Sequence, residues 1–175
     1  MKQTPADFLC KMGWSPQGQE CLKQQIVIGT RAFCVIAAVT PNGFIAWQIF
    51  ECNVTALEFG NFLTNCLGPV LMVDSILLLD NAASHHTDTV RTILHEISDG
   101  KYCYSPPYSP HFKPIEKCFA LVNNHIRANE TTALLNPVPF INATFGLFAV
   151  GGPRAGSILG HWAPYIRARN IFLNS

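Results

Sequence analysis

The chain has 175 residues, 49% of them hydrophobic, which suits one domain with a sizeable core. A formal net charge of +1 argues against a free-standing basic nucleic-acid-binding module, so any DNA contact must be local or rely on metal ions. The seven cysteines are an odd number without a C-x-x-C pair, which predicts free thiols instead of a disulfide framework or a zinc site. Because neither a signal peptide nor a membrane span is recognisable, we expect a soluble intracellular protein, nuclear or cytoplasmic.

The first part of the chain predicts a strand, a hairpin and a helix. Residues 26–28, 32–40 and 44–50 are rich in Val, Ile and Phe, which favours strands. Pro41-Asn42-Gly43 predicts the turn of a hairpin between the last two strands. Thr55 is the expected N-cap of a helix whose apolar residues recur with helical period as far as Leu67, before Gly68-Pro69 ends it.

The middle of the chain predicts two strand–helix units. Residues 75–80 are a short apolar run ending in an acid, which suits a strand buried on both faces of a parallel sheet. Residues 88–98 predict a helix, residues 102–104 a parallel strand, and residues 115–127 a further helix after a proline-rich loop. Beyond Glu130 we expect a loop-rich segment with a basic end. The order of elements therefore indicates a mixed α/β domain.

Asp80 is the first candidate functional residue. It follows an apolar strand, and the carboxyl ends of strands open onto the crevice where α/β domains bind ligands. The alternative is an N-cap for the helix that follows, and composition alone does not decide between the two.

Glu116 is the second candidate, in the first turn of the helix after the proline-rich loop. Taken alone, an ordinary first-turn acid favoured by the helix dipole is the better interpretation. The two acids have 35 residues between them, and each stands where a strand, a loop and a helix meet. We therefore expect them to converge at one edge of the sheet.

The phrases around these acids resemble the catalytic domain of DDE transposases of the mariner superfamily. The resemblance covers residues 12–130 and rests on three phrases: Gly13-Trp14-Ser15-Pro16, then Asp80-Asn81-Ala82 with His85, and finally Pro106-Pro107-Tyr108-Ser109-Pro110 with Pro114-Ile115-Glu116. It implies a ribonuclease H-like fold over that range, with residues 131–175 as an extension. The implied sheet has five strands with helices on both faces.

The resemblance also implies a chemistry, which is metal-assisted phosphoryl transfer at DNA ends. Asp80 and Glu116 would each hold a Mg²⁺ or Mn²⁺ ion, because these ions prefer oxygen ligands. His85, Lys113 and Lys117 are the candidate DNA contacts, although a lone histidine is more often a surface or capping group. DNA is the implied partner, and a homodimer is compatible with the resemblance.

Departures from the family pattern predict impaired activity. The strand with the family's first aspartate has no counterpart in this sequence, since Asp7 is the only acid before Trp14 and leaves no room for a full strand. His111 and Lys113 stand where the family usually has Asp and Asn. Because the missing strand is central in a ribonuclease H-like sheet, we expect a gap between the hairpin and the Asp80 strand. Residues 1–10 would fill that gap poorly or stay loose.

Three interpretations remain open from the sequence. The first is a transposase-derived DDE domain, a fragment or decayed copy whose cleavage and strand transfer are impaired or lost. The second is a domesticated, non-catalytic DNA-binding or protein-interaction module that keeps the fold. The third is an incomplete gene model from which the first strand was lost.

Overall fold

The described part of the molecule is built on one mixed β-sheet. The computed structural model describes residues 25–29, 31–51, 53–72, 74–105, 114–157 and 170–174. Within these residues the sheet has six strands in the order β1-β2-β6-β4-β5, and β3 pairs with β2 as well. The strands are β1 (Gln25–Ile28), β2 (Arg31–Thr40), β3 (Gly43–Phe50), β4 (Ile76–Leu79), β5 (Tyr102–Tyr104) and β6 (Asn170–Asn174).

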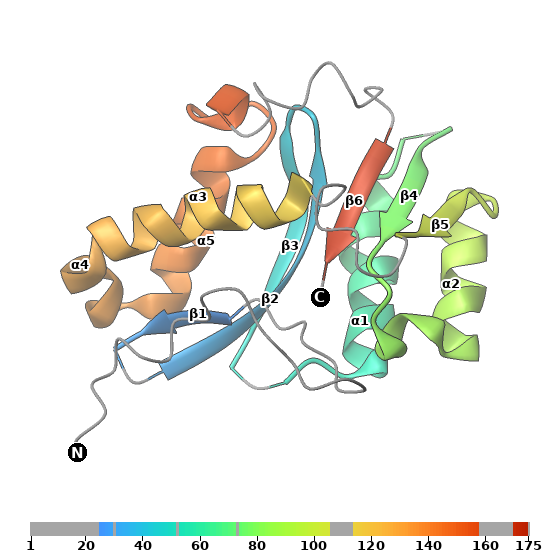
Figure 1. Ribbon diagram of the computed structural model, residues 1–175, viewed down its shortest axis with the longest axis horizontal. Coiled ribbons are helices and arrows are strands. Elements are labelled where there is room, and N and C mark those ends of the chain that lie inside the picture. Colours follow the sequence, from blue (N-terminus) through green and yellow to red (C-terminus); the bar gives the residue numbers. More distant parts are fainter. Residues whose placement is uncertain are drawn as a thin grey trace.

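Helices cover both faces of this sheet (Figure 1). One face carries α1 (Ala56–Phe62), which continues as a π-helical turn and a short 3₁₀ turn, and α2 (Asp88–Ser98). The other face carries α3 (Pro114–Ala128), α4 (Glu130–Leu135) and α5 (Pro137–Phe148). The expectation of a loop-rich segment after Glu130 is therefore wrong for residues 130–148. Proline suits the first turn of a helix, where an N–H has no partner to lose, so Pro137 starts α5 instead of breaking it.

Strand β2 explains why residues 32–40 are apolar without alternation. Its Phe33 and Val35 pack toward α3 and α5, while Ile36 and Ala38 pack toward α1 and α2. Since both faces of the strand are covered, every position from Phe33 to Val39 is buried. The sheet therefore separates two hydrophobic cores, and the predicted mixed α/β architecture is confirmed.

The predicted pairings and caps are confirmed by the structure. β2 and β3 form an antiparallel hairpin, and β4 pairs parallel with β5 through the α2 crossover. Thr55 caps α1 in a capping box with Glu58, while α2 ends at Asp99 in a left-handed conformation. One member of the predicted apolar stripe, Leu57, is 70% exposed and packs on neither core.

The predicted gap in the sheet is absent, because β6 fills it. β6 pairs antiparallel with β2, with Leu173 opposite Ala38, and parallel with β4, with Leu173 opposite Leu79. A strand in this position joins the hairpin to the Asp80 strand, as the first strand does in a ribonuclease H-like sheet. The fold is therefore ribonuclease H-like, with its central strand drawn from residues 170–174. Residues 1–10, which we expected to supply a substitute, lie outside the described residues.

The helices and the cysteines of the described residues bear on the expectations about membrane spans and disulfides. None of the helices in these residues has the length and apolar character that a membrane span requires. The four cysteines described, Cys34, Cys66, Cys103 and Cys118, are free thiols, as the cysteine count predicts.

Candidate functional site

Asp80 lies at the carboxyl end of β4, close to the middle of the sheet. β4 is held on both sides by parallel neighbours, β5 and β6, so its end is fixed within the sheet. The backbone N–H of Ser105 donates to the carbonyl of Leu79 at 2.7 Å, which extends the pairing to the residue before Asp80. The Asp80 side chain is only 4% exposed. The sequence thus delivers a carboxylate to a buried position at the edge where ligands bind in this class of fold.

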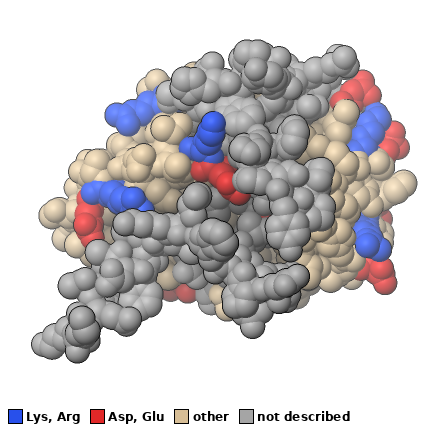
Figure 2. Space-filling view, in the orientation of Figure 1, with Lys and Arg blue, Asp and Glu red and all other residues tan. Residues whose placement is uncertain are grey.

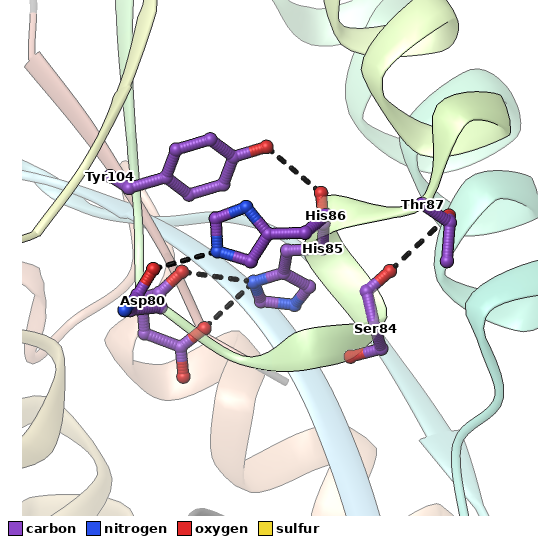
Figure 3. A network of polar contacts seen from close by, with 7 residues as sticks. Asp80, Ser84, His85, His86, Thr87 and Tyr104 are labelled. Carbon is purple, nitrogen blue, oxygen red and sulfur yellow. Dashed lines mark hydrogen bonds and ion pairs between the residues drawn. The ribbon is translucent and has the colours of Figure 1, made fainter.

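The imidazole of His85 is the neighbour that contacts this carboxylate (Figure 3). Nδ1 of His85 lies 2.7 Å from Oδ1 of Asp80 and 3.2 Å from its main-chain oxygen. An N–H at Nδ1 can donate to the main-chain oxygen, whereas the contact with Oδ1 is close but does not have the geometry of a hydrogen bond. Among the described residues, Oδ2 has no hydrogen-bond partner at all. The carboxylate is buried with less than the usual compensation for lost hydration.

The loop after Asp80 holds His85 firmly in place. A 3₁₀ turn, Ala83–His86 (η4), is closed by the N–H of His85 donating to the carbonyl of Ala82 at 3.0 Å. The ring stacks on Phe59 of α1 with centroids 4.0 Å apart and is fully buried. The surface interpretation of His85 is therefore wrong. With no exposed atoms, the ring cannot reach a DNA phosphate unless the loop opens, and its contact with Asp80 suits an orienting role.

The capping interpretation of Asp80 is not supported in the described residues. The residue before the 3₁₀ turn is Ala82, which makes no side-chain cap. Helix α2 is capped by Thr87, whose hydroxyl accepts from the N–H of Val90 at 3.4 Å. Because neither helical start uses the Asp80 carboxylate, a structural role as an N-cap does not explain this acid.

A second set of contacts in this loop was missed by sequence reasoning. Nε2 of His86 lies 2.7 Å from Oδ1 of Asn81, and its ring lies against Tyr104 with centroids 4.2 Å apart. The Tyr104 hydroxyl donates to the main-chain oxygen of His85 at 2.9 Å, and burial raises the pKa of this phenol, so it stays a donor. The two histidines are adjacent in the sequence, but no local pattern connects them with Tyr104, which lies on the next strand after the α2 crossover.

Glu116 stands in the first turn of α3, as predicted, and is half-buried. Helix α3 packs against β6, which in turn pairs with β4. The convergence of Glu116 with Asp80 within about 8 Å, the reach of a two-ion site, remains a prediction. Lys117 is exposed one residue further on, whereas Lys113, His111 and Asp7 lie outside the described residues.

Charged side chains are sparse on the face of the molecule that Figure 2 shows. On the face in Figure 2, lysine and arginine side chains stand singly, most of them beside an acid, and form no continuous basic patch. Within the described ranges, no group of three or more His, Cys, Asp and Glu is placed to hold a metal ion. The assignment of Asp80 and Glu116 as metal ligands therefore remains a prediction.

Comparisons with known proteins agree with the phrases found in the sequence. The family described as DDE superfamily endonuclease matches residues 6–134. No curated protein matches the chain. A solved structure, the Mos1 transposase paired-end complex with left transposon end, is 17% identical with a TM-score of 0.48. The match covers 87% of this chain and 51% of that one, so this chain spans about half the length of that transposase.

Proposed function

Because this chain belongs to the DDE superfamily of endonucleases, we propose that it is a transposase-derived domain that binds DNA and a divalent cation. Asp80 and Glu116 are the proposed ligands of Mg²⁺ or Mn²⁺. Cleavage and strand transfer at DNA ends are proposed to be impaired or lost. DNA as partner and metal as cofactor are carried over from the family, so each needs its own test.

The burial of Asp80 is the observation that supports this proposal most. A buried carboxylate costs several kcal/mol unless it is paired and hydrogen-bonded. Among the described residues, the close contact with the His85 imidazole is the compensation, and neither carboxylate oxygen has a hydrogen-bond partner. A hard cation at Oδ2 would supply the missing partner, since Mg²⁺ and Mn²⁺ favour carboxylate oxygen. The residues present therefore fit such an ion.

The chain's own residues have distinct parts in this proposal. Asp80 presents its free oxygen from a strand end that cannot shift, because β5 and β6 hold β4 on both sides. His85 orients the carboxylate from behind, as residues next to metal ligands commonly do. Glu116 brings a second carboxylate on α3. A bound pair of ions in such sites polarises the phosphoryl group and stabilises the attacking and leaving oxygens.

Impaired activity follows from the number of ligands. The described residues provide no cluster of three acidic or metal-binding side chains. Ions that prefer six oxygen ligands in near-octahedral geometry are held more weakly as carboxylates are removed. We therefore expect weak metal binding and nicking of DNA below detection.

The test measures binding of Mn²⁺ to the full 175-residue chain, using isothermal titration calorimetry and electron paramagnetic resonance. Asp80→Asn and Glu116→Gln should each abolish binding, because each removes one charged ligand without changing shape. Asp99→Asn and Glu96→Gln are the matched controls, since both acids are exposed on α2 or at its end. Binding that survives both Asp80→Asn and Glu116→Gln would sink the proposed site. Nicking that disappears in Asp80→Asn would show that the site is right and that activity is intact.

The non-catalytic module is a second candidate function, favoured because the described residues contain no group of three or more His, Cys, Asp and Glu placed to hold a metal ion. It predicts DNA binding that does not change on addition of EDTA. Binding by Asp80→Asn should then equal that of the unsubstituted chain and fall with increasing salt, since phosphate contacts release counterions. DNA binding that requires Mn²⁺ would instead favour the metal-dependent domain.

A further inference from the structure

Charged residues are divided unequally between the two sides of the sheet. Helices α1 and α2 lie on one side and α3, α4 and α5 on the other (Figure 1). The chain from Glu51 to Lys101, which carries α1 and α2, has seven acids and two bases. The chain from Lys117 to Ser157, which carries most of α3 and all of α4 and α5, has three bases and one acid. The small net charge of the whole chain therefore combines an acidic side with a basic side.

The outward side of α3 carries two of these three bases and no acid from Lys117 to Asn129. Lys117 and Arg127 are both exposed, and ten residues of helix place them about 15 Å apart along its axis. The other exposed side chains near them are small and neutral: Ala120, Asn124 and Ala128. Side chains of this size leave room for a phosphate backbone to approach the cations. Because Lys117 directly follows Glu116, this row begins at the proposed metal site.

Arg154 supplies the third base, from the turn that follows α5. Its guanidinium Nη1 donates to Nδ1 of His125 on α3 at 3.2 Å, because arginine has no acceptor atom. Burial and the charge of Arg154 lower the pKa of His125, so the imidazole remains a neutral acceptor at pH 7. The main-chain N–H of Arg154 donates to the carbonyl of Leu147 at 2.9 Å, which ties the turn to α5. Arg154 is therefore an exposed cation that the fold holds beside α3.

We infer that α3 and the turn after α5 form the surface that contacts the phosphate backbone of duplex DNA, with Lys117, Arg127 and Arg154 as its cations. The inference rests on the proposed function, which supplies DNA as the partner, and adds the face that meets it. Phosphates are repelled by the acids of the α1 and α2 side, whereas each cation on the other side releases counterions when it meets a phosphate. Arg154 lies beyond residues 6–134, so similarity to the family does not reach it.

The experiment measures binding of a fluorescein-labelled DNA duplex to the full 175-residue chain by fluorescence anisotropy. Binding is followed over a series of NaCl concentrations, in EDTA and again with Mn²⁺. Lys117→Gln, Arg127→Gln and Arg154→Gln should each weaken binding several-fold at low salt. Each should also reduce the slope of log K against log salt concentration by about 0.9, because each removes one phosphate contact. The triple variant should reduce that slope by about 2.7.

Arg91→Gln and Lys101→Gln are the matched controls. Each removes one positive charge from the acidic side of the sheet, on α2 or just after it, and should leave the salt slope unchanged. His125→Phe keeps an aromatic ring and removes the acceptor of Arg154. It should weaken DNA binding in the unsubstituted chain and have no further effect in Arg154→Gln. Circular dichroism of each variant shows that the fold is retained.

The outcomes separate this inference from the proposed function. If the duplex still binds and the three variants have the same salt slope as the controls, the inference is overturned and the proposed function stands. A larger loss in Arg91→Gln or Lys101→Gln also overturns it, because DNA would then lie on the other side. Displacement of the duplex by polyglutamate more readily than by unlabelled duplex overturns it in favour of an acidic protein partner. If no duplex binds at low salt, the inference and DNA as partner both fail, while titration with Mn²⁺ still decides the metal site.

Discussion

The contact between His85 and Asp80 can be isolated by replacing the histidine with phenylalanine. His85→Phe keeps an aromatic ring that can stack on Phe59, which lies 4.0 Å away between centroids, and fills most of the buried volume. It removes Nδ1, the atom that lies 2.7 Å from the Asp80 carboxylate. The substitution therefore tests the polar contact with little change in packing.

The expected loss follows from the chemistry of the pair. A hydrogen bond to a charged group contributes about 1.5–3 kcal/mol, and poor alignment favours the lower part of that range. We expect His85→Phe to lower the free energy of unfolding by about 2 kcal/mol and the melting temperature by roughly 4–8 °C. In the Asp80→Asn background the same change should cost less than about 1 kcal/mol, which leaves a coupling energy of about 1 kcal/mol or more.

Urea denaturation followed by circular dichroism, in EDTA, gives the four free energies of this cycle. EDTA is needed because a bound cation would compete with the imidazole for the carboxylate. His86→Phe is the control, since that ring lies against Tyr104 and contacts Asn81, and its cost should be the same with Asp80 or Asn at position 80. Equal costs of His85→Phe in both backgrounds would refute the argument that His85 orients Asp80.

Three further predictions concern the scaffold. Gly43→Ala should destabilise the fold by about 2 kcal/mol or more, because Gly43 has φ +130° and an added Cβ would lie 2.7 Å from the main-chain oxygen of Phe148 at the end of α5. Gly146→Ala should instead stabilise the fold by about 0.5–1 kcal/mol, because no atom lies within contact distance of a Cβ there. Thermal melts of both variants check this. Thr55→Ala should cost about 1 kcal/mol by removing the cap of α1, measured by urea denaturation. Burial raises the pKa of Cys118 to about 12, so at pH 8 its thiol stays protonated and should resist iodoacetamide in the native protein, while exposed Cys103 reacts; peptide mass spectrometry that finds both modified equally would contradict this.

Local patterns were enough to predict the sheet's outer parts and the place of Asp80. Three features depend only on short stretches of chain, so local patterns of residues predict them: the apolar run of β2, the Pro41-Asn42-Gly43 turn and the α2 crossover. The position of Asp80 at a strand end follows from the same local reading. The burial of His85 does not, because it depends on Phe59, a residue of another helix that the sequence does not connect with it.

Strand β6 could not be predicted from local sequence patterns, for a physical reason. Only Ile171, Phe172 and Leu173 are apolar between two asparagines, and such a short run fits a strand or a loop equally well. This segment is a strand because it pairs with both β2 and β4, whose facing N–H and C=O groups would otherwise lie unpaired in the middle of the sheet. Backbone hydrogen bonds satisfy these groups, and such bonds depend little on which side chains the pairing strand carries. The residue that ends beside Asp80 is therefore set by register, so similarity to the family over residues 6–134 could not have predicted it.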